Sequence, residues 1–379
     1  MTTTQSSEAA PKATAAPAVS AAVLVRNAVI KYGFIFVTVA LFLYFALSEG
    51  SFRESATLLD TLRYVSVAAI LGLGVTLTMA VGGMDMSVGA VAGLGVTVAA
   101  KTMVTYNQVG TVAILAVIAA GALAGLLNAL LIVVMKIPDM LATLGTMFVI
   151  QGTKLILVDG QSISAGMTQS DGTTAPGKFT AGFLRIDRGT LLGIPISVVI
   201  FGALTVVAWV FLARTRWGRV LYAIGANPEA SRLAGIRVGA YRALAYVLSG
   251  VLASMGGLIL ASRIGQGDVS AGTSQLLEAV AVALVGTSVL GRGRPNVWGT
   301  ALGAVLIGII TTGLTIKGLP YYTQDVVEGA VLILALVFSF PVQAPHRIRK
   351  FEEFVRWATA SWRPTTSRPT CTSAATGRT

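Results

Sequence analysis

The sequence predicts an all-α, polytopic membrane protein with about ten transmembrane helices and with both termini in the cytoplasm. The 379 residues are 54% hydrophobic and only 12% charged, with a mean hydropathy of +0.78. A soluble domain carries roughly a quarter charged residues, so this chain has too little polar surface to cover a globule in water. Apolar stretches recur at close to the ~20 residues that a membrane-crossing helix needs, and Lys and Arg gather in alternate gaps between them.

Three regions follow from composition. Residues 1–25 are rich in Ala, Thr and Ser and lack the compact apolar core of a signal peptide, so we expect a disordered N-terminal tail. Residues 26–345 carry the apolar stretches and form the transmembrane domain. Residues 346–379 are polar, and we expect a largely disordered cytoplasmic tail there.

Eight stretches are long enough for full spans: 32–47, 64–82, 109–135, 141–158, 191–213, 242–261, 297–316 and 325–341. Two apolar pieces, 86–100 and 276–290, are shorter. They are either half-helices that enter and return, or crossings shielded inside the bundle.

The positive charges favour ten crossings. If all ten pieces cross and the N-terminus is cytoplasmic, most of the 28 Lys and Arg lie on the cytoplasmic side, as in most membrane proteins. If the short pieces returned instead, the loop 214–242 with its six arginines would face outward. The net charge of +12 is therefore read as a membrane orientation signal. We expect no nucleic-acid partner, because no basic patch is interleaved with aromatic residues.

A polar insert interrupts the second apolar region. Residues 82–89 read Gly-Gly-Met-Asp-Met-Ser-Val-Gly and place Asp85 between two apolar pieces. An ionised carboxylate is costly at membrane depth unless it faces protein, water or a partner. The favoured interpretation is that Asp85 caps a helix beginning at Met86; the alternative is a polar pathway or a hinge. The candidate residues for the pathway or hinge are Gly82, Gly83, Asp85, Ser87, Asn128 and Thr143.

The long cytoplasmic loop specifies a short helix. Asn227 suits the N-cap, Pro228 the first helical position and Glu229 the first turn. Gly235 suits the left-handed residue that ends a helix. So short a helix needs a surface to dock against, either its own bundle or a groove on a soluble partner.

Enzymatic chemistry has no basis in the sequence. The one Gly-Lys pair, Gly177-Lys178, is followed by Phe179, so there is no Gly-x4-Gly-Lys-Ser/Thr phosphate loop. The one histidine, His346, and the one cysteine, Cys371, both lie in the C-terminal tail. We therefore expect a non-catalytic chain that binds no metal and no cofactor.

Taken in order, several segments resemble the ribose-type permease family of bacterial ABC importers. They are 78–89, with Gly-Gly-Met-Asp-Met-Ser-Val-Gly; 138–147, Pro-Asp-Met-Leu-Ala-Thr-Leu-Gly-Thr-Met; 159–161; 224–236; and 285–304. The spacing Glu229-Ala230-Ser231-x3-Gly235 is also close to the Glu-Ala-Ala-x3-Gly loop of such permeases. Three positions depart from the family pattern: Asp139, Val285 and Arg292.

This resemblance implies a permease subunit in the bacterial plasma (inner) membrane for a simple sugar such as ribose. It implies a separate ATPase that holds ATP and magnesium, an extracytoplasmic solute-binding protein, and a second permease copy forming a homodimer. The residues Asn227, Pro228, Glu229, Ala230 and Gly235 would then form the loop that couples to the ATPase. The alternative from another class is an ion-coupled secondary transporter that uses Asp85, Lys154 and Glu278.

Overall fold

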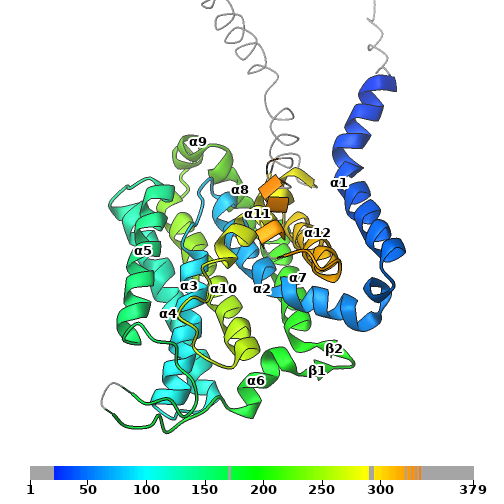
Figure 1. The fold of residues 1–379 in the computed structure, drawn as a ribbon. Coiled ribbons are helices and arrows are strands. Elements are labelled where there is room, and N and C mark those ends of the chain that lie inside the picture. Colours follow the sequence, from blue (N-terminus) through cyan, green and yellow to red (C-terminus); the bar gives the residue numbers. More distant parts are fainter. Residues whose placement is uncertain are drawn as a thin grey trace, which may run out of the picture.

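The computed structural model describes residues 21–169, 172–289 and 294–320, and single positions between 322 and 333. The described part is a helical bundle with one two-stranded hairpin (Figure 1). The predicted span 325–341 and the tails 1–20 and 346–379 fall largely or wholly outside the described residues.

Within the described residues, seven helices are long and apolar enough to cross a membrane. They are α2 (Ser55–Ala80), α3 (Val88–Ala100) with its π-helical extension Lys101–Thr105, α4 (Gly110–Ala129) with its π-helical extension Leu130–Val134, α5 (Asp139–Leu157), α7 (Ile196–Arg214), α10 (Val238–Ile264) and α12 (Val297–Ile316). The other elements are α1 (Ala21–Ser48), a short 3-10 helix (Gly50–Arg53), α6 (Ala181–Arg188), β1 (Thr190–Leu191), β2 (Ile194–Pro195), α8 (Arg216–Ala226), α9 (Pro228–Leu233) and α11 (Gln275–Val289). The predicted all-α, polytopic class is confirmed; the count of ten stays a prediction.

The two short pieces turn out differently from each other. The predicted piece 86–100 is continued by a π-helical turn, so the apolar helix runs to Thr105 and reaches 18 residues, with most of its surface buried. It is long enough to cross a membrane and is shielded by its neighbours, which favours the crossing over the half-helix interpretation. The second piece, α11, remains short at 15 residues.

Three helix starts differ most from the sequence prediction. α2 begins at Ser55, not at residue 64, because the polar positions Asp60 and Arg63 continue the helix beyond the apolar window. α7 begins at Ile196, not at residue 191, because residues 190–195 form the hairpin β1–β2. α1 begins at Ala21, so residues 21–25 of the predicted tail are helical.

The centre of the bundle is α10, which packs against α2, α3 and α4. Small residues permit this packing, as expected where helices associate without a hydrophobic drive. A Cβ atom on Gly250 would collide with the carbonyl oxygen of Gly121 on α4, so the two backbones are in direct contact. The helix α9 lies at one end of the bundle, and α6 and the hairpin lie at the other (Figure 1).

Candidate functional site

The candidate site lies at the break between α2 and α3. α2 ends at Ala80, and Gly82 has a positive φ of 79°, a conformation that favours glycine. Gly83 has no room for a side chain, because a Cβ atom there would collide with the side chains of Asp139 and Tyr246. The predicted glycine pair therefore does break the helix, and the chain then passes through Asp85 to Val88, the first residue of α3.

Asp85 is the centre of a buried polar cluster that joins three helices. Its Oδ1 accepts hydrogen bonds from the Ser87 backbone N–H at 2.9 Å and from Ser87 Oγ at 2.6 Å. Its Oδ2 accepts a hydrogen bond from Ser249 Oγ on α10 at 2.8 Å. Asn128 Nδ2 on α4 lies 3.5 Å from Asp85 Oδ1, and the Asp85 side chain is fully buried. The carboxyl group is thus hydrogen-bonded through both oxygens, as a buried polar group requires.

The cap interpretation of Asp85 is wrong. α3 begins at Val88, with Ser87 at the N-cap position and without a side-chain cap hydrogen bond. Asp85 accepts from Ser87, the residue two positions later, in a local turn that precedes the helix. Its remaining bonds cross to α4 and α10, so its role is to hold three helices together at the break.

Asn128 leaves one polar atom unused. Its Nδ2 donates to Ser87 Oγ at 2.8 Å, whereas its Oδ1 is buried without a hydrogen-bond partner among the described residues. Leaving a buried acceptor unpaired costs about 1–3 kcal/mol, so such atoms often mark functional positions.

Thr143 joins the cluster from α5. Its Oγ1 accepts from the Met86 backbone N–H at 3.1 Å and donates to the Asp139 carbonyl at 2.9 Å. The structure therefore gathers all six predicted pathway or hinge residues at one break. Ser249 was missed, because a single serine in an apolar helix usually bonds only its own helix carbonyls and gives no sequence signal.

The break lies inside the bundle and not at its surface. Ser249 is 11 residues from Val238, the first residue of α10, and a helix rises about 1.5 Å per residue, which places it about 16 Å along that helix. Beside Gly83, Arg242 Nη2 contacts both carboxylate oxygens of Asp139 at 2.6 Å. Asp139, one of the three departures from the family pattern, thus has a charged partner on α10.

The loop helix α9 has the predicted local structure. Asn227 Oδ1 accepts from the Ala230 backbone N–H at 2.9 Å, Pro228 is the first helical residue, and Gly235 has a φ of 80°. Ser231 is buried against the bundle. The opposite side of the helix is exposed and carries Glu229, Ala230, Arg232 and Leu233.

Leu233 is 87% exposed on this side of the helix. The sequence prediction did not single out Leu233, although a lone leucine on a polar six-residue helix is visible in the sequence. This side of α9 offers a small mixed surface to a partner.

The residues predicted to couple to an ATPase do not touch the polar cluster, but Gly225, just before them in the chain, touches the break. Gly225 packs on the backbone of Ala80 and Gly82, so closely that a Cβ atom on Gly225 would collide with the Ala80 carbonyl. A displacement of α8 and α9 would therefore be transmitted directly to the end of α2.

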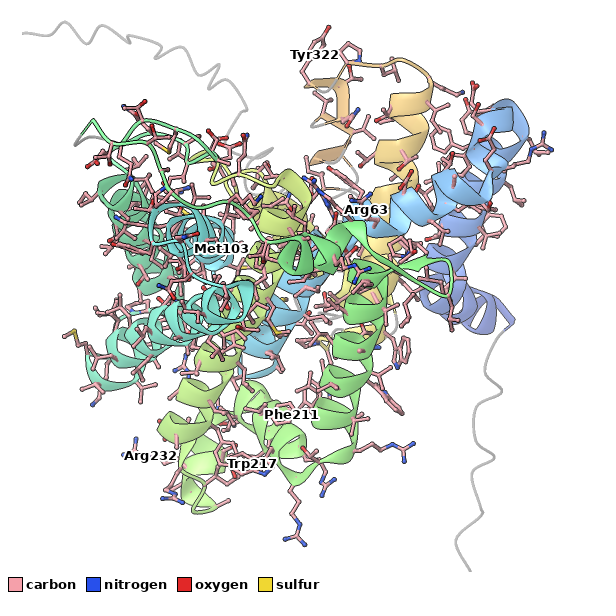
Figure 2. All side chains as sticks on the ribbon, turned by 90° about the horizontal axis from the view of Figure 1, so that it is seen from below. Arg63, Met103, Phe211, Trp217, Arg232 and Tyr322 are labelled. Atoms are coloured by element: carbon pink, nitrogen blue, oxygen red, sulfur yellow. The ribbon has the colours of Figure 1, made fainter. Side chains whose placement is uncertain are left out.

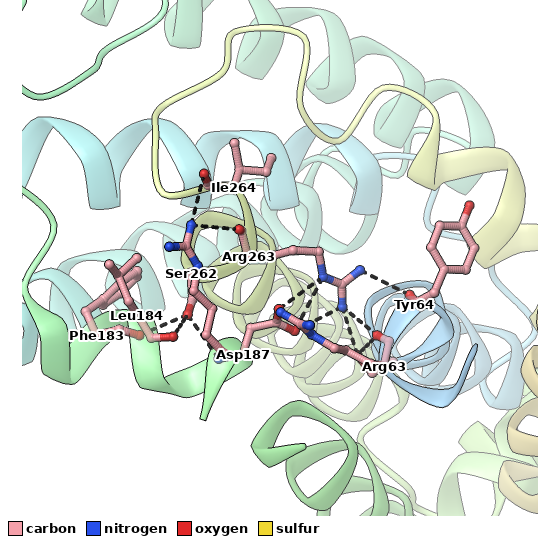
Figure 3. Close-up of polar contacts among 10 residues, drawn as sticks. Arg63, Tyr64, Phe183, Leu184, Asp187, Ser262, Arg263 and Ile264 are labelled. Atoms are coloured by element: carbon pink, nitrogen blue, oxygen red, sulfur yellow. Dashed lines mark hydrogen bonds and ion pairs between the residues drawn. The ribbon is translucent and has the colours of Figure 1, made fainter. Parts of the chain in front are cut away.

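A second charged cluster lies near α6, at the other end of the bundle (Figure 3). The fully buried Asp187 side chain is paired with Arg63 of α2 at 2.6 Å and with Arg263 of α10 at 3.1 Å. Burial raises the pKa of Asp187, but the hydrogen bonds and charges of the two arginines outweigh it, so the pKa lies below its usual value. The sequence prediction did not pair these residues, which are separated by more than 70 positions.

The residues of the ion-coupled alternative do not converge. Lys154 Nζ donates to the Ala271 carbonyl at 3.3 Å, and Glu278 accepts from Tyr64 Oη at 2.9 Å. Asp85 instead bonds Ser249 and Ser87. Among the described residues, no three His, Cys, Asp or Glu side chains lie close enough to hold a metal ion.

A bundle of apolar helices with a buried polar cluster at a helix break is typical of a multi-pass membrane transport protein. Residues 57–336 match the model of the family described as "branched-chain amino acid transport system / permease component". The chain belongs to this family of permeases.

Curated relatives agree with this assignment. The ribose import permease of Bacillus subtilis is 34% identical over 76% of this chain and 86% of its own length. The ribose import permease of Escherichia coli K12 is 33% identical over 74% and 84%. The galactose/methyl galactoside import permease of Escherichia coli K12 is 32% identical over 77% and 88%. No solved structure matches the chain significantly.

Two predictions are thereby confirmed. The resemblance to sugar-importing ABC permeases holds over most of the chain, and the chain is a multi-pass protein of the bacterial plasma membrane. The similarity to membrane transport subunits also agrees with the prediction that the chain is not an enzyme.

Proposed function

We propose that this chain is the membrane-spanning subunit of an ATP-driven importer for ribose or a related monosaccharide. The observation that carries the proposal is the 34% identity to a ribose import permease over 76% of the chain. Galactose is the second candidate, because the galactose/methyl galactoside import permease is nearly as similar.

In this proposal, three kinds of partner complete the transporter. A separate ATPase binds ATP and magnesium, so this chain holds no cofactor. An extracytoplasmic binding protein delivers the sugar, and a second copy of this chain forms a homodimer around the pathway.

The ATPase would contact the exposed side of α9. Asn227, Pro228 and Gly235 set the shape of that helix, and Glu229 and Ala230 lie on its exposed side. When the ATPase closes, α9 and α8 move together, and Gly225 passes the motion to Gly82 at the end of α2. The cluster of Asp85, Ser87, Asn128, Thr143 and Ser249 is the element that changes arrangement. Such a transition needs an element with two discrete packings, and a helix break that side-chain hydrogen bonds tie to neighbouring helices is suited to it.

We further propose ten crossings with both termini in the cytoplasm. The start of α1 and the helix α9 both lie toward the upper side of the bundle in Figure 1. The six arginines of residues 214–242, from the end of α7 to the first turns of α10, gather on that side, which favours a cytoplasmic location. The predicted stretch 325–341 would supply the tenth crossing.

Reconstitution into vesicles tests the proposal. The chain is combined with the ATPase and the binding protein encoded by neighbouring genes, and uptake of radiolabelled ribose is measured. We expect uptake only when ATP and both partners are present. Uptake by this chain alone, driven by a proton or sodium gradient, would instead establish the secondary-transporter alternative.

Competition then identifies the sugar. Unlabelled ribose and unlabelled galactose are added in increasing amounts to the ATP-driven assay. We expect ribose to reduce uptake of the label at lower concentration than galactose does. The reverse order would favour the second candidate, and competition by a branched-chain amino acid alone would overturn the sugar assignment.

A further inference from the structure

An apolar groove opens on the bundle surface between α7 and α10. It has a volume of about 540 Å³ and is lined almost entirely by aliphatic and aromatic side chains. Those that define it are Leu204, Phe211, Trp217, Leu248, Leu252 and Met255. The groove holds no member of the Asp85 cluster and no residue of α9. Only Trp217, on α8, belongs to the part of the chain that moves in the proposed function.

The groove has the length of one lipid leaflet. On α10 its lining runs from Leu244 to Met255, which is about 16 Å of helix at 1.5 Å per residue. The hydrocarbon core of a bilayer is about 30 Å thick, so the groove covers about half of it. It begins near Trp217 and ends close to the middle of α10.

The mouth of the groove lies at a membrane interface. Trp217 is 53% exposed and packs against Tyr241, with ring centroids 5.6 Å apart. Trp and Tyr are enriched at the level of the lipid headgroups. Figure 2 shows Phe211 and Trp217 close together, toward the same end of the molecule as Arg232 of α9.

Positive charge surrounds this mouth. Arg214 ends α7, and Arg216 and Arg219 lie in the first turn of α8 on either side of Trp217. All three side chains belong to exposed residues, and none forms an ion pair within the described part of the chain. Basic clusters at the end of an apolar groove between transmembrane helices suit an anionic lipid headgroup.

We propose that this groove binds one acyl chain of an anionic phospholipid, with the phosphate held by Arg214, Arg216 and Arg219. The charge at the mouth favours a lipid over a second copy of the chain. In a two-fold interface the same patch meets itself, so the arginines of two copies would face each other without an acid between them.

Tryptophan quenching tests the proposal, because Trp217 lies in the groove wall. The other tryptophans (Trp209, Trp298, Trp357 and Trp362) are replaced by Phe. The protein is then placed in vesicles of phosphatidylcholine containing brominated phosphatidylglycerol or, separately, brominated phosphatidylcholine. We expect at least threefold stronger apparent binding of phosphatidylglycerol at Trp217. Equal quenching by the two lipids would overturn the proposal.

Two variants separate the headgroup site from the groove. Replacing Arg214, Arg216 and Arg219 together by Ala should bring the preference for phosphatidylglycerol close to one. A control that removes three exposed positive charges near the opposite end (Arg53, Lys178 and Arg185 to Ala) should leave the preference unchanged. A loss of preference in both would mean that net charge, and not this site, selects the lipid, and would count against the proposal.

A measurement on the unmodified chain covers the case in which the Phe substitutions disturb folding. Native mass spectrometry of protein released from mixed nanodiscs should show retained phosphatidylglycerol in excess of phosphatidylcholine. If instead neither lipid is retained and Val207→Cys forms a disulfide between two copies, the groove is a dimer interface and the lipid assignment is wrong.

Discussion

At the residue scale, Asp85 is a buried side chain that is costly to bury and that hydrogen-bonds to residues on neighbouring helices. Its carboxylate is buried in the bundle and accepts hydrogen bonds from Ser87 and Ser249, while Asn128 lies just beyond Ser87. Removing the carboxylate leaves those donors unpaired, and each buried unpaired group costs about 1–3 kcal/mol. Asp85 thus matters both to the stability of the helix break and to the proposed transport of the solute past it.

We expect Asp85→Ala to reduce ATP-driven uptake at least tenfold, while the protein still reaches the membrane. Asp85→Asn keeps an acceptor oxygen and the side-chain shape, so it should lose less thermal stability than the alanine variant. The measurements are uptake in reconstituted vesicles and the unfolding temperature in detergent. Unchanged uptake in Asp85→Ala would remove the residue from the pathway.

Asp187 gives a pH prediction at the same scale. Its pKa is lowered in the folded protein because the pairing with Arg63 and Arg263 outweighs the effect of burial. The stabilisation of the folded protein by the ionised Asp187 is therefore complete above the pKa of about 3.9 that Asp has in the unfolded chain. It is lost as the pH falls through the lower pKa of the folded protein.

We expect Asp187→Asn to lower stability at pH 7 by about 2 kcal/mol, between the values for exposed and for fully buried pairs. The difference between the two proteins should shrink as the pH falls below 4, because the wild-type carboxylate then becomes protonated. Thermal unfolding from pH 7 to pH 3 measures this. A constant difference over the whole range would contradict the assigned ion cluster.

At the element scale, α9 depends on its two ends. The Asn227 side chain fixes the first turn, and Gly235 leaves the helix with a φ of 80° that a β-branched residue adopts only with strain. A Cβ atom on Gly235 would meet no atom within 4 Å, so the effect of a substitution there is conformational and not a collision.

We expect Gly235→Val to abolish ATP-driven uptake without loss of protein from the membrane. The strain, about 1–3 kcal/mol, is small against the stability of the bundle but large for a six-residue helix. Gly235→Asn, which tolerates the left-handed conformation, should keep most of the activity. Gly202→Val in α7, where a Cβ atom also meets nothing within 4 Å, is the matched control. Normal transport by Gly235→Val would count heavily against the role of α9.

The sequence predicted the helices better than the connections and the side-chain contacts between them. Capping residues and turn glycines are local signals, so α9 and the break at Gly82 were found from the chain itself. The continuation of α3 through a π-helical turn and the hairpin before α7 depend on neighbouring segments and left no periodic signal. The partners Ser249, Arg63 and Arg263 come from distant helices, and pairing of that kind is decided by packing.

At the scale of the whole molecule, the apolar helices and the placement of positive charge both fit a bundle that crosses a bilayer in one orientation. The bundle buries its polar break in the interior, gathers arginines beside α9, and leaves the apolar faces of α4, α5 and α7 exposed, as a bilayer requires. The central claim is that a separate ATPase drives this bundle through α9, which requires that helix to lie in the cytoplasm.

Cysteine accessibility tests that requirement most directly. Cys371 is replaced by Ser, Ala230 on the exposed side of α9 is replaced by Cys, and intact cells are treated with a membrane-impermeant maleimide. The account predicts no labelling until the cells are lysed, and protection after lysis when the partner ATPase is bound. Labelling of Ala230→Cys in intact cells would contradict it.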